Sequence, residues 1–368
     1  ASVPSGGAAA TPVEESLRRV ASLRAGLYVD KAARPEFAKV LLVTAANSAY
    51  WKFYENWACA ATRHGLDWAA VANDDASEEK LGPERALPVS GTKVSAMVGW
   101  GDIRLDYVGR SKMHTAMRIM QLTGMDVVFT DCDNVFIRDP FAAGVKLGDW
   151  IRSGKYDYIY QQELQTRPKA DWKAGGDGGN TGFWYASARK KGLQGFFGSV
   201  VEVLDARLKK HPAADQPVWW ELFNELKQSQ GQKCGEASFC GGLRCVKMCD
   251  REASCAAPDE ETLSCCPMDP WKHPTGWEDA DKYRGELITY HANYASNMDK
   301  VKKLQKIQLW DLCNANFAVA SLGGPDATPD AGGRASSSPK QATSHSETVA
   351  GPGVDGRIKS VAKLRAGL

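Results

Sequence analysis

The sequence predicts an α/β protein in which helices flank a sheet. Three observations predict it. Apolar runs of strand length end in small or polar residues, segments with a helical apolar pattern follow them, and glycines close two of those segments. Apolar residues make up 43% of the 368 residues, including 12 Trp, 11 Tyr and 11 Phe, so one main core is expected.

The first strand is expected at Val40–Thr44, an apolar run that ends in small and polar residues. A helix should follow, because apolar residues between positions 53 and 64 recur at steps of three and four. Ser48 is its expected N-cap and Gly65 its expected end. With a second strand at Trp68–Ala72, the unit forms a parallel crossover, whose ligands usually gather at the carboxyl ends of the strands.

The same pattern recurs next to an acidic pair. A methionine-rich helical stripe over residues 113–120 is stopped by Gly124, and Asp126–Thr130 is the expected next strand. That strand runs into Asp131-Cys132-Asp133, so the two acids lie at its carboxyl end. Asn134–Pro140 is expected to continue in an extended form.

Three later segments complete the expected secondary structure. Tyr156–Tyr160 and Gly182–Ala186 supply further strands, and Met298–Leu312 has the pattern of a basic amphipathic helix.

The chain divides by composition. Residues 1–35 are expected to be a stem or lead-in with a short basic helix within Leu17–Leu27, and residues 36–318 form the main domain. Residues 319–356 are mostly Gly, Pro, Ala, Ser and Thr, so we expect a disordered linker, followed by a short basic helical segment at 357–368.

Cysteine usage indicates the compartment. Seven of the ten cysteines lie between Cys234 and Cys266, a density typical of disulfide-forming proteins, and we interpret residues 234–266 as an insertion. A zinc site is the alternative, but the run contains no C-x2-C pair and no histidine. We therefore expect the Golgi lumen or another secretory-pathway compartment.

Charge and hydropathy limit the partners. The formal net charge is +2, with 46 basic and 44 acidic residues, which gives no general electrostatic reason to bind nucleic acid or a membrane surface. No stretch approaches the roughly 20 apolar residues of a membrane span. Any membrane attachment is expected only through a segment absent from this chain.

Asp131 and Asp133 have the chemistry of a divalent-cation site. Mg²⁺ and Mn²⁺ take oxygen ligands and use few carboxylates, which leaves positions for phosphate oxygens and water. A buried strand would fix both acids at the open edge of the sheet. As an isolated pattern, however, D-x-D is common, and two exposed loop acids are the alternative.

Further segments in a fixed order favour the functional interpretation. Together they resemble the nucleotide-diphospho-sugar transferase domain of glycosyltransferase family 77, over about residues 38–312. The segments are Lys112–Pro140, Asn180–Phe183, Asp215–Pro217, His291–Asn293, Lys300 and Leu309–Asp311. The resemblance implies a GT-A, Rossmann-like fold with a mixed sheet, a UDP-sugar donor, a manganese-type cation and retention of anomeric configuration. It also implies transfer of a pentose or galactose to a glycan or glycoprotein acceptor.

Residue by residue, the resemblance implies a cation held from two sides. Asp131 would face the ribose or the cation, Asp133 would be the main carboxylate ligand, and His291 would complete the ligands. Without the resemblance, His291 would be interpreted as a structural residue. Lys112 and Lys300 would neutralise the diphosphate, although a solvated helix face is the alternative for both.

The remaining candidates surround the donor. Residues beside the nucleobase or ribose, or else simple turn residues, are Thr44, Ala45 and Asn47. Residues with groups suited to sugar hydroxyls are Asn180, Thr181, Asp215 and Gln216. Asp215 and Gln216 are placed nearest the anomeric carbon, where retention needs either a covalent attack or a same-face departure and attack. Asn297 departs from the family pattern, in which glycine is common.

Two alternatives belong to other classes. Residues 127–135 also fit the strand-D-x-D-x-[TV] pattern of haloacid-dehalogenase-like phosphatases, with Asp131 as nucleophile. A strand-helix-strand unit precedes the motif here, and no later acidic pair is evident, which argues against that class. The other alternative is a cysteine-stapled carbohydrate-binding protein without turnover.

Overall fold

The computed structural model describes residues 10–27, 30–32, 34–99, 101–169, 178–208, 214–229, 241–249 and 259–314. All of them lie in one compact unit, Ala1–Ala315. The second unit, Asn316–Leu368, lies outside the described residues, and so do the expected linker and the expected last helix. Of the cysteine-rich stretch, residues 241–249 and 259–266 are described.

An eight-stranded mixed sheet forms the centre, in the order β3-β2-β1-β4-β7-β6-β9-β8. Its strands are β1 Val40–Ala46, β2 Ala69–Ala72, β3 Ala86–Pro88, β4 Asp126–Thr130, β6 Tyr158–Gln162, β7 Gly179–Ala186, β8 Cys245–Met248 and β9 Thr262–Pro267. Strands β3, β2, β1 and β4 pair in parallel, whereas β7 runs antiparallel to both β4 and β6. Strand β9 is parallel to β6 and to β8. The structure therefore confirms the predicted mixed α/β sheet.

A small second sheet consists of β5 Asn134–Phe136 and β10 Thr289–His291, which pair antiparallel. Strand β5 follows β4 after the acidic turn, so the expected extended segment is a strand only in its first part. This pairing brings a late part of the chain to the carboxyl end of β4.

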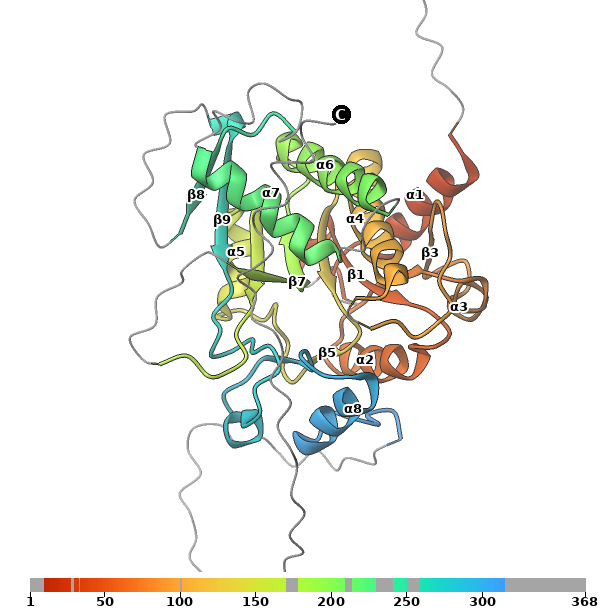
Figure 1. The fold of residues 1–368 in the computed structure, drawn as a ribbon, viewed down its shortest axis with the longest axis vertical. Helices are drawn as coiled ribbons and strands as arrows, with labels where there is room; N and C mark the ends of the chain where they lie inside the picture. The colour runs from red at the N-terminus through yellow and green to blue at the C-terminus, as the bar shows by residue number, and fades with distance from the viewer. Residues whose placement is uncertain are drawn as a thin grey trace, which may run out of the picture. The chain divides into compact units, whose positions relative to one another are not determined.

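Helices cover both faces of the sheet (Figure 1). They are α1 Pro12–Arg24, α2 Trp51–Arg63, α3 Asp75–Leu81, α4 Ile103–Thr123, α5 Lys146–Ser153, α6 Lys191–Arg207, α7 Asp215–Ser229 and α8 Asn297–Lys306. Short 3-10 helices lie at Pro35–Phe37, Asp259–Glu261 and Ala280–Tyr283. Figure 1 shows α4, α6 and α7 together over the sheet, and the apolar residues of α1 belong to the same core.

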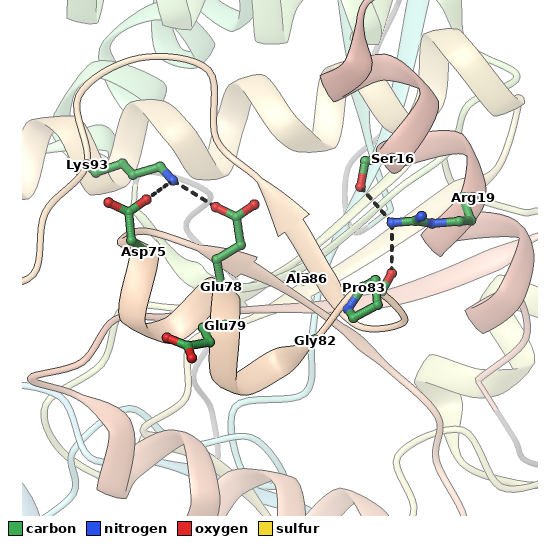
Figure 2. Close-up of a pocket in the computed structure, with 9 residues that line it drawn as sticks. All are labelled: Ser16, Arg19, Asp75, Glu78, Glu79, Gly82, Pro83, Ala86 and Lys93. Carbon is green, nitrogen blue, oxygen red and sulfur yellow. Dashed lines mark hydrogen bonds and ion pairs between the residues drawn. The ribbon is translucent and has the colours of Figure 1, made fainter.

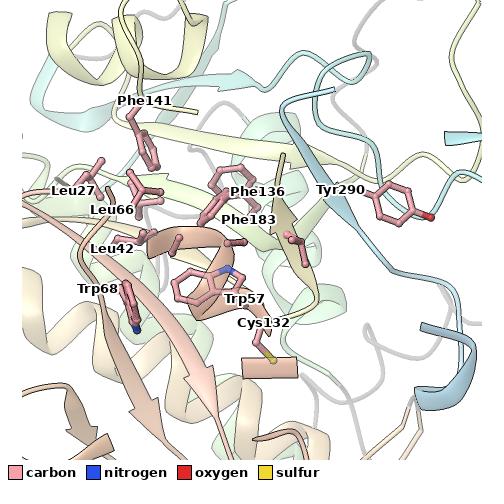
Figure 3. Packing of buried hydrophobic residues seen from close by; sticks show 14 of the residues in the cluster. Leu27, Leu42, Trp57, Leu66, Trp68, Cys132, Phe136, Phe141, Phe183 and Tyr290 are labelled. Atoms are coloured by element: carbon pink, nitrogen blue, oxygen red, sulfur yellow. The ribbon is translucent and has the colours of Figure 1, made fainter. Parts of the chain in front are cut away.

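Strand β1 shows how the two cores form. Leu41 and Val43 pack into the core under α1, α4, α6 and α7, whereas Val40 and Leu42 pack into the opposite core with residues of α2 and α5. Side chains alternate along a strand, so a continuous apolar run predicts burial on both faces. Figure 3 shows part of the second core, where Trp57 is prominent.

Most elements predicted in the first half of the chain are present in the structure. The predicted strands at β1, β2 and β4 are present, and α4 ends at Gly124, whose φ of 68° is left-handed. The predicted cap of α2 is wrong. The Ser48 amide and hydroxyl donate to Asp74 Oδ2 at 2.8 and 2.6 Å, and the helix begins after Tyr50.

The last helix is shorter than predicted. It ends at Lys306 rather than Leu312, because the following chain turns with φ of 58° at both Gln308 and Asp311. The expected apolar residues beyond it, such as Leu309 and Leu312, are still buried. Periodicity therefore indicated burial correctly but not the helical conformation.

The lead-in contributes a helix to the core. Thr11 and Glu14 form a capping box at the start of α1, and Leu17, Val20 and Ala21 are buried against the sheet and α4. None of the described helices is long and apolar enough to cross a membrane.

Disulfides are present among the described cysteines. Cys249 pairs with Cys266, which confirms the disulfide interpretation for that part of the cysteine-rich stretch. A second bond, Cys59–Cys313, ties the chain after α8 to α2. Its pairing had no signal in the sequence. The described free cysteines, Cys132 and Cys265, are buried.

Candidate active site

The acidic pair lies in a turn between β4 and β5. The Asn134 amide donates to the Asp131 carbonyl at 3.0 Å, which closes the turn, and the Asp131 amide donates to the Gly182 carbonyl of β7 at 2.7 Å. Cys132 packs into the second hydrophobic core (Figure 3). The residue between the two acids thus anchors the turn.

His291 reaches the acids through the small sheet. In the β5–β10 pairing it lies opposite Asn134, and the next amide, of Ala292, donates to the Asp133 carbonyl at 3.0 Å. One ligand atom each of Asp131, Asp133 and His291 lies within 4.8 Å of the others. His291 Nε2 is 3.3 Å from Asp133 Oδ1. The structure brings together the three residues predicted to hold a cation.

Lys300 completes this side of the site from α8. Its Nζ is 2.7 Å from Asp133 Oδ2, and the Asp133 side chain is only 5% exposed. Burial alone would raise the pKa of Asp133, but the charge of Lys300 outweighs it and holds that pKa far below its usual range. Burial would likewise lower the pKa of Lys300, but Asp133 holds it well above its ordinary value. The pair is ionised.

Lys112 lies on the other side, in α4, and its side chain is 6% exposed. Its Nζ is 2.6 Å from Asp215 Oδ2 and 3.8 Å from Asp131 Oδ1, and it donates to the Thr181 carbonyl at 3.1 Å. Burial lowers the pKa of Lys112, but Asp131 and Asp215 outweigh burial, so this pKa is raised. A Cβ at Gly109 would come within 2.7 Å of Asp215 Cβ, so a glycine is needed for α7 to approach.

Gly182 keeps the space between the predicted ligands open. A Cβ there would lie 2.4 Å from Asp131 Oδ2 and 2.5 Å from His291 Cε1. Three carboxylates, those of Asp131, Asp133 and Asp215, face two lysines, which leaves net negative charge when the imidazole is neutral. Two carboxylates and one imidazole are also donors that Mn²⁺ and related divalent cations accept. The residues therefore fit a divalent cation.

The donor-side residues are placed at the start of β7 and of α7. Asn180 Oδ1 accepts from the Gly182 amide at 2.6 Å, and the Thr181 amide donates to Gln216 Oε1 at 3.3 Å. Gln216 is half-buried, whereas Asp215 is buried and bound to Lys112. Thr181, Asp215 and Gln216 thus adjoin the Lys112 side of the site, whereas the Asn180 side chain bonds Glu163.

The residues at the end of β1 are used by the fold itself. Asn47 Nδ2 donates to the carbonyls of Val94 and Ala96 at 3.0 Å, and its Oδ1 accepts from the Tyr50 amide at 2.8 Å. Thr44 is fully buried and Ala45 partly buried. The turn alternative thus describes the Asn47 side chain.

Comparison with known proteins identifies the family. The sequence profile of the nucleotide-diphospho-sugar transferases matches residues 68–306, which include both acids, His291 and the two lysines. The chain belongs to this family. This match favours the transferase interpretation over the phosphatase and non-catalytic interpretations.

Solved structures add little to the identity of this transferase. Two structures of the glycosyltransferase GlyE from Streptococcus pneumoniae TIGR4, one of them the apo form, are similar at 14% and 15% identity, with TM-scores of 0.31 and 0.30. In each case the match covers 55% of this chain and 49% of the other, so it spans about half the length of GlyE. No curated protein matches.

Two polar residues near the site were not predicted from the sequence. Gln161 lies between His291 and Asn134, and Glu163 accepts from the side chains of Asn180 at 2.6 Å and Asn293 at 3.1 Å. Both lie at the carboxyl end of β6, which was predicted to stop at Tyr160. The rule that sites gather at strand ends, applied to this strand, would have pointed to them.

A cavity of about 490 Å³ lies elsewhere in the transferase, among residues of α1, α3 and β3 (Figure 2). Several of its polar and charged residues bond one another. Lys93 binds both Asp75 and Glu78, and Arg19 donates to Ser16 and to the Pro83 carbonyl. None of the cation-site residues lines this cavity.

Proposed function

We propose that this chain is a retaining, divalent-cation-dependent glycosyltransferase of family 77 that transfers a pentose or galactose from a UDP-sugar to a hydroxyl group of a glycan or glycoprotein. One observation carries the proposal. Asp131, Asp133 and His291 come from distant parts of the sequence, yet their ligand atoms lie within 4.8 Å of one another. This cluster lies at the carboxyl end of a central strand, inside the region that matches the family.

The cation in this proposal is Mn²⁺ or Mg²⁺, held by Asp131, Asp133 and His291. When bound, it supplies positive charge that stabilises the diphosphate leaving group. The protein's own part is to keep Asp133 ionised, through Lys300, and to keep the space beside Gly182 open.

The two lysines have different parts. Lys300 is 18% exposed and pairs with the carboxylate of Asp133, so its ammonium group can exchange that partner for a phosphate oxygen. Lys112 is 6% exposed and is held by Asp215, Thr181 and Asp131. We assign Lys300 to the diphosphate and Lys112 to positioning the acids around the donor.

The donor sugar is placed beside the first turns of β7 and α7. Asn180 and Thr181 would contact its hydroxyl groups, with Asp215 and Gln216 nearest the anomeric carbon. The family resemblance supports retention, by covalent attack or by a same-face departure and attack. Thr44 and Ala45, at the end of β1, lie on the nucleotide side in this proposal, and Asn47 holds the turn that follows them.

The compartment follows from the cysteines. The disulfides Cys59–Cys313 and Cys249–Cys266 support an oxidising environment. We propose the Golgi lumen or another secretory-pathway compartment.

The test is UDP release from a panel of UDP-sugars, with and without glycan and glycopeptide acceptors, in Mn²⁺ and after chelation by EDTA. We expect release that depends on Mn²⁺ and falls by about 10²- to 10³-fold in Asp133→Ala, because the diphosphate loses its stabilisation. Asp75→Ala, whose carboxylate is 92% exposed in the separate cavity, is the matched control and should behave as the parent does. Parent-like turnover in Asp133→Ala, or turnover unaffected by EDTA, would contradict the proposal.

A further inference from the structure

Gln161 is a fully buried amide with four hydrogen-bond partners. Its Nε2 donates to the carbonyl oxygens of His273 and Pro274 at 3.0 and 3.2 Å. Its Oε1 lies 3.2 Å from Asn134 Nδ2 and 3.2 Å from His291 Nδ1. This side chain therefore connects the loop before β10 with the predicted cation ligand.

These partners fix the orientation of the amide. A carbonyl oxygen can only accept, so the two carbonyls require the NH₂ end of Gln161. The oxygen end must then face His291. Because that oxygen also only accepts, His291 Nδ1 must carry a hydrogen, and a neutral imidazole then has its lone pair on Nε2.

The lone pair of Nε2 points at another acceptor. Asp133 Oδ1 lies 3.3 Å from Nε2, while Asp133 Oδ2 is already paired with Lys300. Two acceptors at this distance repel unless a proton or a cation lies between or beside them. The pair is thus arranged so that a divalent cation can take both atoms as ligands.

We infer that Gln161 is a positioning residue that holds His291 in the Nδ1–H tautomer, so that Nε2 is available as a ligand to a divalent cation. The inference rests on the cation site of the proposed function. A group that accepts from the second nitrogen of a ligating histidine also orients the ring and raises its basicity. Gln161 would act through His291 and would not touch the cation.

The fold places Gln161 by an irregularity in β6. Tyr160 pairs with Trp184, but the next residue, Gln161, pairs with Asn180, so the register shifts between them. Such a bulge changes the direction of a side chain. Asn134, the other donor to Gln161, is the partner of His291 in the β5–β10 register, so three strands converge on one amide.

The first test compares Gln161→Leu with Gln162→Leu. Both glutamines are buried neighbours in β6, and the Gln162 side-chain nitrogen has no hydrogen-bond partner, so the second variant is a matched control for loss of a buried amide. Binding of Mn²⁺ is measured by calorimetry or by electron paramagnetic resonance, without donor or acceptor. We expect binding about 10- to 100-fold weaker in Gln161→Leu and within about twofold of the parent in Gln162→Leu.

The second test reads the tautomer directly in the cation-free protein. Nitrogen-15 resonances of labelled histidines distinguish Nδ1–H from Nε2–H, and His291→Gln identifies the signal among the six histidines. We expect Nδ1–H for neutral His291 in the parent and a loss of this preference in Gln161→Leu. This measurement on the parent also decides the matter if Gln161→Leu does not fold, because a predominant Nε2–H form would overturn the inference.

Asp133→Ala distinguishes an error in the cation site from an error in the role of Gln161. If the parent and Asp133→Ala bind Mn²⁺ equally, the cation site itself is wrong and the inference falls with it. If Asp133→Ala loses binding but Gln161→Leu binds as well as Gln162→Leu, the cation site stands and the role of Gln161 is refuted. If Gln161 has only a structural role, Gln161→Leu would lower the free energy of unfolding without changing the affinity for Mn²⁺.

Discussion

The candidate active site contains two ion-pair groups that are similar in composition and differ in how they are held. The Lys112 group consists of Lys112, Asp131 and Asp215, and the Lys300 group consists of Lys300, Asp133 and His291. Lys112 has two carboxylates and a carbonyl around it and is 6% exposed. Lys300 pairs with the carboxylate of Asp133 and is 18% exposed.

The two groups also belong to different parts of the fold. The Lys112 group joins α4, β4 and α7, which pack on one another around the first core. The Lys300 group depends on β10 and α8. The chain after α8 is attached to α2 by Cys59–Cys313 and by Asn56, which donates to the Leu309 carbonyl and accepts from the Leu312 amide. The comparison suggests that the Lys112 group mainly serves stability and the Lys300 group mainly serves ligand binding.

The largest expected effect is on stability, in Lys112→Met. Removing this lysine leaves Asp215, 9% exposed, without its cation, and breaking such a buried pair costs about 3–5 kcal/mol. Chemical denaturation would measure the change in the free energy of unfolding.

Lys93→Met is the control for that prediction. Lys93 also contacts two carboxylates, but it is 33% exposed and Asp75 is 92% exposed, so we expect a loss of less than about 1 kcal/mol. Equal losses in Lys112→Met and Lys93→Met would show that the Lys112 group is not the buried structural link that we describe.

The next effect is on turnover, in Lys300→Met. If Lys300 binds the diphosphate, kcat/KM for the donor should fall about 10²-fold, equivalent to about 2.7 kcal/mol. Its effect on the free energy of unfolding should be smaller than that of Lys112→Met, because Lys300 is 18% exposed and water can take the place of its ammonium group. Initial rates over a range of donor concentrations give both kinetic constants.

Lys302→Met tests whether any lysine of α8 can bind the diphosphate. Lys302 is 72% exposed and pairs with Asp299 in its own helix, so its removal should leave kcat/KM unchanged. A similar loss in the two variants would indicate general attraction by a basic helix. A loss of stability without a loss of kcat/KM in Lys300→Met would reverse the division between the two groups.

The Lys112 group was easier to predict from the sequence, because its elements carry local signals. The apolar run that ends at Thr130 predicts β4, and the stripe closed by Gly124 predicts α4. Both Lys112 and Asp131 therefore had a definite place before the structure was known. Asp215 required the family resemblance, since α7 had not been predicted.

The Lys300 group depends on contacts between distant segments, which local patterns do not encode. Strands β5 and β10 have three residues each, too few for a periodic signal, yet their register places His291. The bulge that turns Gln161 and the pairing Cys59–Cys313 are likewise properties of the assembled chain. Ser48 is of a residue type that often caps helices, but its hydroxyl donates instead to Asp74, which follows the next strand.

The smallest effect concerns pH and the loop behind the Lys300 group. Burial lowers the pKa of His273 to about 3, against about 6.5 in the unfolded chain, and its carbonyl holds Gln161. Below pH 6.5 the unfolded state therefore binds a proton that the folded state does not. Stability is lost as the pH falls from about 6.5 toward 3, by about 2 kcal/mol between pH 7.5 and pH 5.

His273→Gln should remove that part of the pH dependence, which unfolding experiments at the two pH values would measure as a difference from the parent. His114→Gln is the control, because His114 is only half-buried and the lowering of its pKa, caused first by burial and then by Arg110, is less complete. His273 Nδ1 lies 3.1 Å from Thr289 Oγ1 in β10. If His273→Gln flattens the pH dependence of stability, the strand that carries His291 packs against an uncharged imidazole. An unchanged profile would mean that this loop opens to solvent in the folded protein, and the Lys300 group would then be less rigidly held than its hydrogen bonds indicate.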